Sequence, residues 1–132
     1  MATLDDETRA LLEAPNIIQL GSIGKDCVPH ITPVWADVED GKIVVNSAEG
    51  RIWPRNVRRD PRVTISVSPP ENPYAHTLIR GRVVEDTHEG ADDMIDHLAK
   101  KYLGVDRYPY HRPDEQRVTF KIEPEKVSKL VN

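Results

Sequence analysis

The chain has 132 residues, of which 38% are hydrophobic, 30% are charged and 5% are aromatic. This length and balance fit one globular domain over residues 1–132 and exclude a disordered chain. The formal net charge of −4 and the single cysteine exclude a chain-wide basic nucleic-acid footprint, an internal disulfide and a zinc or iron–sulfur site built from cysteines.

The N-terminal half predicts one helix and three strands. Asp5 or Asp6 can cap a first helix that Pro15 stops. Three strands follow, over residues 17–24, 28–38 and 42–47. The turns between them are short, which predicts a meander with antiparallel pairing. Pro54 then suits the start of a short helix within residues 50–60.

The C-terminal half predicts more strands around one longer helix. A strand over 63–67 alternates apolar and polar residues, and Gly81 marks a bulge or bend in a long strand over 74–87. Next come a helix over 89–103, a polar loop over 105–115 and strands over 117–122 and 126–131.

Residue usage agrees with this pattern. The chain holds 31 Val, Ile and Thr residues against 10 Leu and Met, and branching at Cβ suits a strand better than a helix. The 11 prolines further limit long helices. Six or seven antiparallel strands with a few short helices make a mainly β fold and predict a small closed or nearly closed β-barrel.

Positive charge gathers in the middle of the chain. Residues 51–62 hold five arginines and one aspartate and follow a turn that contains glycine. A turn that leads into a helix start directs backbone N–H groups outward, and arginines beside it can bind phosphate oxygens. The segment therefore predicts an anion site, although short arginine-rich helices are also typical of a solvated surface. Trp53 within it can cover a planar ligand or serve in packing.

Other candidate sites are weaker. The five histidines are scattered and none has a ligand spacing backed by a carboxylate, so no metal site is predicted. The pattern predicts a solvated helix face for Asp92, Asp93 and Asp96, and an exposed thiol in a turn for Cys27. No Walker, dinucleotide or Gly-x-Ser-x-Gly motif occurs. The acidic N-terminus and the lack of an 18-residue apolar run predict a cytoplasmic protein.

Three stretches resemble one family. The run GKDCVPHITPVW at 24–35 resembles the G-x-P-H-x-x-P-V-W strand pair of the pyridoxamine-phosphate-oxidase-like split-barrel proteins. Residues 46–51 and 55–63 resemble the phosphate-binding part of that superfamily, and RGRV at 80–83 resembles its x-G-x-A/V strand. Within the superfamily, the chain is most similar to the actinobacterial branch that binds the deazaflavin coenzyme F420.

The resemblance implies a split β-barrel that forms a homodimer, with two flavin sites at the subunit interface and a contribution from residues 74–78 of the second subunit. The implied cofactor contacts are Pro33, Val34 and Trp35 for the ring, Asn46, Ser47 and Ala48 for its edge and the ribityl chain, and Arg51, Arg55 and the nearby Asn56 for the phosphate.

One position departs from the family pattern. Trp53 stands where the family commonly has a lysine that contacts the phosphate, and an indole cannot replace that charge. Three outcomes stay open: Arg51 and Arg55 suffice, the cofactor is displaced, or binding is weak. Loss of one charge-assisted contact costs about 1.5–3 kcal/mol, on the order of tenfold to a hundredfold in affinity.

The leading hypothesis is an oxidoreductase that transfers a hydride from reduced F420 to an electron-poor planar substrate, an enone or a quinone. Two alternatives keep the fold: an FMN-dependent oxidoreductase, and a flavin- or deazaflavin-binding protein without turnover. Nucleic-acid binding by a small barrel fits the local arginines but not the scarcity of aromatic residues and the acidic remainder.

Overall fold

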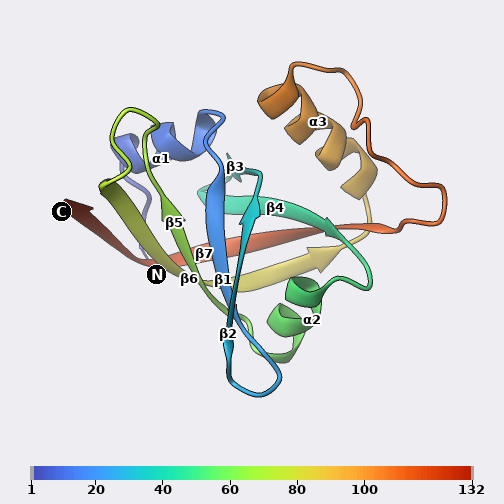
Figure 1. The fold of residues 1–132 in the computed structure, drawn as a ribbon, viewed down its shortest axis with the longest axis horizontal. Coiled ribbons are helices and arrows are strands. Elements are labelled where there is room, and N and C mark those ends of the chain that lie inside the picture. Colours follow the sequence, from blue (N-terminus) through green and yellow to red (C-terminus); the bar gives the residue numbers. More distant parts are fainter. Residues whose placement is uncertain (1, 132) are drawn as a thin grey trace.

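The computed structural model describes residues 2–131, which form seven strands and three helices (Figure 1). The helices are α1 (Asp6–Glu13), α2 (Ile52–Arg59) and α3 (Ala91–Leu103). The strands are β1 (Ile18–Ile23), β2 (Pro29–Val34), β3 (Ala36–Glu39), β4 (Lys42–Ala48), β5 (Arg62–Val67), β6 (Ala75–Thr87) and β7 (Arg117–Val131). The expected mainly β class with a few short helices is confirmed.

All strands join one antiparallel sheet in the order β2-β1-β5-β6-β7-β4-β3. Strands β2 and β3 lie at its two opposite edges, yet Trp35 alone separates them in the chain. Because one residue spans only a few ångströms, the sheet has to curl until its edges approach each other. The result is the expected split β-barrel, and Trp35 lies where its edges meet.

The strand expected over 28–38 is therefore wrong as a single element. Its first part pairs with β1 and its second part pairs with β4, so the chain crosses the split at Trp35. The alternation of side chains is similar on both sides of this residue, and for that reason the sequence pattern does not reveal the break.

A second difference concerns the C-terminal strands, which we expected as two. Strand β7 runs unbroken from 117 to 131, with Pro124 opposite Gly81 at a register shift. A proline has no N–H for a regular ladder, and a bulge accommodates it. The same shift confirms the bulge that was predicted at Gly81.

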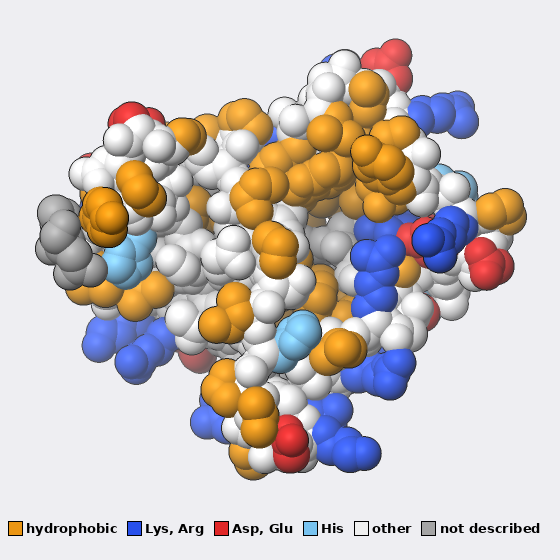
Figure 2. Space-filling model, in the orientation of Figure 1, with side chains coloured by type: hydrophobic (Ala, Val, Ile, Leu, Met, Phe, Trp, Pro, Cys, Tyr) orange, Lys and Arg blue, Asp and Glu red, His pale blue; other side chains and the backbone are white. Residues whose placement is uncertain are grey.

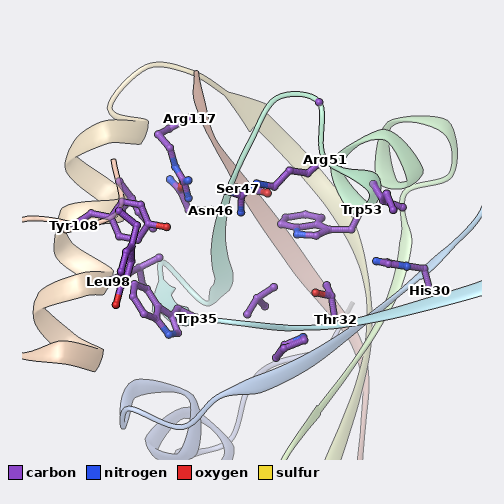
Figure 3. A pocket seen from close by; sticks show the side chains of 16 residues that line it. His30, Thr32, Trp35, Asn46, Ser47, Arg51, Trp53, Leu98, Tyr108 and Arg117 are labelled. Carbon is purple, nitrogen blue, oxygen red and sulfur yellow. The ribbon is translucent and has the colours of Figure 1, made fainter. Parts of the chain in front are cut away.

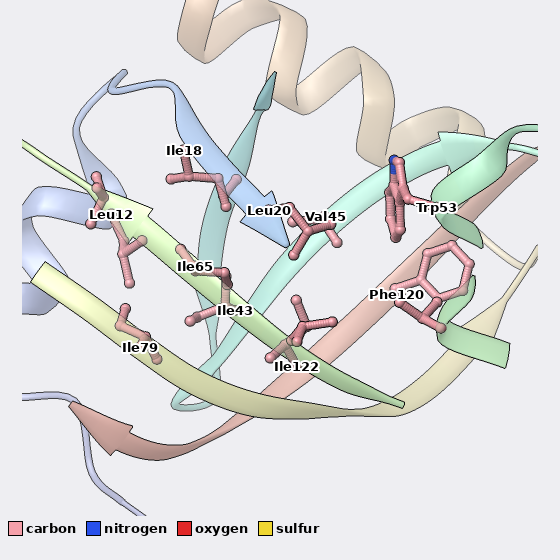
Figure 4. Packing of buried hydrophobic residues seen from close by; sticks show 14 of the residues in the cluster. Leu12, Ile18, Leu20, Ile43, Val45, Trp53, Ile65, Ile79, Phe120 and Ile122 are labelled. Atoms are coloured by element: carbon pink, nitrogen blue, oxygen red, sulfur yellow. The ribbon is translucent and has the colours of Figure 1, made fainter. Parts of the chain in front are cut away.

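The barrel interior is filled by alternate side chains of the strands (Figure 4). Helix α1 adds Leu12 to this core, and α2 adds Trp53, whose ring lies 4.9 Å from that of Phe120. Each fully buried aliphatic or aromatic side chain contributes roughly 1.5–3 kcal/mol. The core residues from the strands are Ile18, Leu20, Ala36, Ile43, Val45, Val63, Ile65, Val67, Ile79, Val118, Phe120 and Ile122.

The helix ends follow local sequence signals. The Asp5 side chain accepts the Thr8 N–H at 2.9 Å, so Asp5 is the expected cap of α1. Helix α3 begins at Ala91, two residues later than predicted, and Gly104 ends it with a φ of 74°. Within residues 2–131, no helix is long and apolar enough to cross a membrane.

We expect Gly81→Ala to destabilise the fold. A Cβ at Gly81 would lie 2.7 Å from the Glu123 carbonyl oxygen and 2.8 Å from Ile122 Cγ2, so strands β6 and β7 would have to separate, at a cost of about 1–3 kcal/mol. Urea unfolding followed by circular dichroism measures the change.

Gly21→Ala is the matched control, because its nearest contact would be the Thr64 carbonyl oxygen at 3.4 Å. Its unfolding free energy should stay within about 1 kcal/mol of that of the original chain. Equal losses for the two variants would show that close packing at the bulge is not the cause.

Candidate functional site

A pocket of about 500 Å³ lies in the seam where the sheet edges approach each other (Figure 3). Strand β3 pairs with β4 only as far as Val45, so the last residues of β4 face the open seam. Ligand pockets commonly measure 300–1,000 Å³. The lining residues are His30, Thr32, Pro33, Val34, Trp35, Asn46, Ser47, Gly50, Arg51, Ile52, Trp53, Ile95, Leu98, Tyr108, Tyr110 and Arg117.

One wall of the pocket is aromatic and firmly held. The Trp35 indole stacks on the Tyr102 ring, with 5.2 Å between centroids and 9° between planes, and Tyr108 meets Trp35 edge-on at 6.1 Å. The Tyr102 hydroxyl donates to the Asn16 carbonyl at 2.7 Å and accepts the Ala36 N–H at 3.0 Å. Burial raises the pKa of Tyr102, so this hydroxyl remains a donor and keeps Trp35 in place.

Lys101, which lies on α3, stabilises the same region around Trp35. Its ammonium donates to the Leu12 carbonyl at 2.6 Å and to the Ala36 carbonyl, and it lies 3.6 Å from the Asp37 carboxylate. Burial lowers the pKa of Lys101, which the nearby Asp37 charge opposes. The helix is thus joined to the end of α1 and to the start of β3.

Asn46 is a buried hydrogen-bond centre. Its side-chain amide donates to the Ala91 carbonyl at 2.9 Å and to Thr119 Oγ1 at 3.1 Å. Its carbonyl oxygen accepts from Arg117 Nε at 2.9 Å. Both of its donors are therefore engaged within the protein, and the side chain holds the first turn of α3 against β4 and β7.

Three charged side chains meet beside the pocket. Arg117 forms an ion pair with Glu115, and its guanidinium lies 5.1 Å from the centre of the Tyr108 ring. Arg51 Nη2 lies 3.7 Å from Glu115 Oε1 and its side chain is 54% exposed. Arg117 is thus buried and paired, whereas Arg51 remains accessible from the pocket.

Ser47 supplies an unpartnered group. It is 1% exposed and lines the pocket, and its Oγ has no hydrogen-bond partner within the described chain. Buried hydroxyls are nearly always paired with protein, water or ligand. The Ser47 hydroxyl is therefore suited to a polar atom of a bound molecule.

Of the ten residues predicted to contact the cofactor, Trp53 included, the structure brings seven together around this pocket and leaves three outside its lining. Ala48 is buried in the core. Arg55 donates to the Gly50 carbonyl, and Asn56 donates to Ser22 Oγ at 3.0 Å. Arg55 and Asn56 line an adjoining hollow that shares His30 and Ile52 with the pocket. Of the two arginines predicted for the phosphate, Arg51 thus lines the pocket and Arg55 lies beside it.

Of the other arginines of the 51–62 segment, Arg59 lines the adjoining hollow with Arg55, and Arg58 and Arg62 lie outside both cavities. Arg58 forms ion pairs with Glu49 and Asp86, and Arg62 pairs with Asp60. Arg59 Nη1 lies 3.5 Å from Asn56 Oδ1. The solvated-surface interpretation thus describes most of the segment, and the anion-site interpretation is confined to its first residues. Figure 2 shows hydrophobic side chains around the opening of the pocket and Lys and Arg side chains beside it.

Sequence reasoning did not identify several lining residues. Ile95 and Leu98 lie on the apolar face of α3, and Tyr108 and Tyr110 lie on the loop over 105–115; the aromatic residues of that loop were the available signal. For Arg117 the sequence offers no signal, because the Asn46 side chain that accepts its Nε–H lies 71 residues away in the chain. Among residues 2–131, no three His, Cys, Asp or Glu side chains gather as a metal site would require.

One protein family matches almost the whole chain. The profile of the family described as "Pyridoxamine 5'-phosphate oxidase" matches residues 4–130. The expected resemblance to that family is thereby confirmed. No curated protein matches the chain closely enough to be counted as a relative.

Solved structures share the fold across the whole chain. A protein named "F420 Reductase" is 24% identical with a TM-score of 0.82, over 95% of this chain and 98% of its own. A conserved hypothetical protein from Mycobacterium tuberculosis is 20% identical with a TM-score of 0.69, over 99% and 86%. HupZ from Group A Streptococcus is 17% identical with a TM-score of 0.69, over 97% and 94%. At sequence identities of this size, the similarity to these structures shows the fold alone.

The turn that presents Arg51 is anchored by Glu49, and this predicts a pH dependence of stability. Hydrogen bonds from Arg58 and His88 lower the pKa of Glu49 from 4.5 to about 2. A lowered folded-state pKa stabilises the fold above pH 4.5, and this stabilisation is lost as the pH falls toward 2. We expect Glu49→Gln to lose about 1 kcal/mol at pH 6, since partial exposure screens the pairs, and to lose nothing near pH 2.

Urea unfolding between pH 2 and 7 measures this difference. Glu71→Gln is the control, because its exposed side chain lies in the loop between β5 and β6. A Glu49→Gln curve that runs parallel to that of the original chain down to pH 2 would contradict the assignment.

Proposed function

The chain belongs to the pyridoxamine 5'-phosphate oxidase family, and we propose that it is an oxidoreductase that binds coenzyme F420 in the seam pocket. The proposed reaction passes a hydride from the reduced coenzyme to an electron-poor planar substrate of the enone or quinone type. The observation that carries the proposal is one pocket with the aromatic wall of Trp35 and Tyr108 on one side and Arg51 on the other (Figure 3). A solved structure of the same fold is named "F420 Reductase".

The residues present fit a flat, phosphorylated coenzyme. Trp35 and Tyr108 offer aromatic surface to a ring system, and Pro33 and Val34 add apolar contacts. The buried Ser47 hydroxyl has no partner within residues 2–131 and suits a polar atom of the ring edge or ribityl chain. Arg51 supplies the charge for the phosphate.

When bound, the reduced deazaflavin supplies a hydride from its ring carbon. The protein then has to orient the two planar molecules and exclude water. Trp35 is immobilised by Tyr102, and the α3 wall is fixed through Asn46, so the pocket is ordered in advance. Tyr108, Tyr110 and His30 line it and can deliver the proton that a reduced enone or quinone needs, as can solvent.

We further propose that the working unit is a cytoplasmic homodimer of one domain per chain. Strand β2 is a sheet edge whose Pro29, Ile31 and Pro33 face outward, with Ile31 67% exposed. An exposed apolar edge strand is a template for association. A second copy seated there would lie beside the seam pocket and could add residues 74–78 to it.

FMN in place of F420, or binding without turnover, is the second candidate. Trp53 is packed against Phe120 in the core, and Arg55 is hydrogen-bonded to the Gly50 carbonyl. Phosphate binding then depends mainly on Arg51. With so few charged contacts, the protein would hold its ligand too weakly or in the wrong position for turnover.

The proposal predicts that the purified protein binds F420 more tightly than FMN in a fluorescence titration. Arg51→Gln should weaken F420 binding about tenfold to a hundredfold, as expected for one charge-assisted contact. It should leave the affinity for the phosphate-free deazaflavin unchanged. Arg62→Gln is the control, since that arginine is paired with Asp60 outside the pocket.

Turnover is tested separately, by mixing the protein with reduced F420 and a panel of enones and quinones. Protein-dependent oxidation of the coenzyme is expected with at least one member of the panel. Tight F420 binding with no oxidation across the panel would remove the enzyme and leave a binding protein. Failure to bind either coenzyme would remove both candidates.

A further inference from the structure

A buried carboxylate stands between the two arginines of the pocket. The Glu115 side chain is 8% exposed, and its Oε1 faces Arg117 Nη1 and lies 3.7 Å from Arg51 Nη2. Its backbone N–H donates to the Arg112 carbonyl at 3.1 Å, which fixes it at the junction of the loop and β7. A negative charge at this place is unexpected beside a site for an anion.

The two arginines depend on this carboxylate differently. The Arg117 side chain is 2% exposed, and a guanidinium so buried has to be paired. Its Nε is bound by Asn46 and its face lies against Tyr108, so its charge is largely satisfied inside the protein. Arg51 is too far from Glu115 for a hydrogen bond and keeps its donors free, but it lies within the field of that carboxylate.

The three groups, two guanidiniums and one carboxylate, together carry a net charge of about one positive unit. A ligand anion at Arg51 is attracted by two guanidiniums and repelled by one carboxylate. Attraction and repulsion both grow in proportion to ligand charge, so the net positive cluster attracts a dianion more than a monoanion, and the carboxylate reduces this difference.

We propose that Glu115 is a specificity-determining residue that reduces the advantage of a dianionic phosphomonoester over a monoanionic phosphodiester in the pocket. The inference rests on the proposed function and deepens it. The phosphate of F420 is a diester with one charge, whereas the terminal phosphate of FMN is a monoester with a second pKa of about 6. Glu115 thereby weakens the binding of FMN more than the binding of F420 at neutral pH.

The test compares the affinities of FMN and F420 at pH 8, each divided by that of its phosphate-free form, riboflavin or the free deazaflavin. The ratio for FMN isolates the contribution of its phosphate, and the ratio for F420 isolates that of its phosphate together with the group esterified to it. In Glu115→Gln, the ratio for FMN should rise about tenfold relative to the ratio for F420, as expected for the loss of one nearby charge. Fluorescence titration gives all four dissociation constants.

Two further variants test whether charge is the cause. Glu115→Gln combined with Arg117→Gln restores the original net charge and should restore the original preference. Arg117→Gln alone lowers the net charge and should move the preference further toward F420, which tests the proposal even if Glu115→Gln does not fold. Glu7→Gln is the control, because this glutamate on α1 is 78% exposed and lies 3.4 Å from Lys129.

The outcomes separate the two claims. Binding of both coenzymes with equal phosphate ratios in all variants would overturn the role of Glu115 and leave the proposed function standing. A shift in Glu115→Gln that the double variant does not reverse would also overturn it, since packing and not charge would then be responsible. Failure of the original chain to bind either coenzyme would overturn both claims.

Discussion

The single residue between β2 and β3 is the constraint from which the rest of the site follows. These strands form opposite edges of one sheet, and Trp35 is all the chain that joins them. The sheet has to curl, its edges have to meet beside this residue, and the meeting is incomplete because β3 covers only the first part of β4. The pocket is the space that this incomplete closure leaves, and the side chain at the crossing becomes its wall.

A pocket in a seam needs to be held open and rigid, and here buried polar groups do this. Asn46 ties α3 to β4 and β7, and the Tyr102 hydroxyl ties the same helix to Asn16 and to Ala36, the residue that follows Trp35. Satisfied hydrogen bonds of this kind are costly to break in a buried place. Other donors of the pocket, among them the guanidinium of Arg51, take no part in these bonds and are the ones that a ligand can use.

The sequence predicted the elements better than the connections between them. Alternation located the strands, and Asp5, Gly81 and Gly104 marked a cap, a bulge and a helix end because each effect is local. The break at Trp35 was missed because alternation continues through it. The motif around Asn46 and Arg51 indicated residues that line the pocket, but the roles of Asn46 and Arg117 depend on partners 45 to 73 residues away in the chain, which no local pattern reveals.

The tryptophan at the family's lysine position links stability to binding. Trp53 is buried against Phe120 and attaches α2 to the barrel, so the residue that we propose removes a phosphate contact also positions the helix that follows Arg51. The proposed site has one accessible guanidinium with a carboxylate close to it, so electrostatic attraction contributes little to its affinity for a ligand. Ligand binding then has to come largely from stacking and apolar contact along the Trp35 wall. A pocket of that kind selects first for a flat ring system and only second for the charge attached to it.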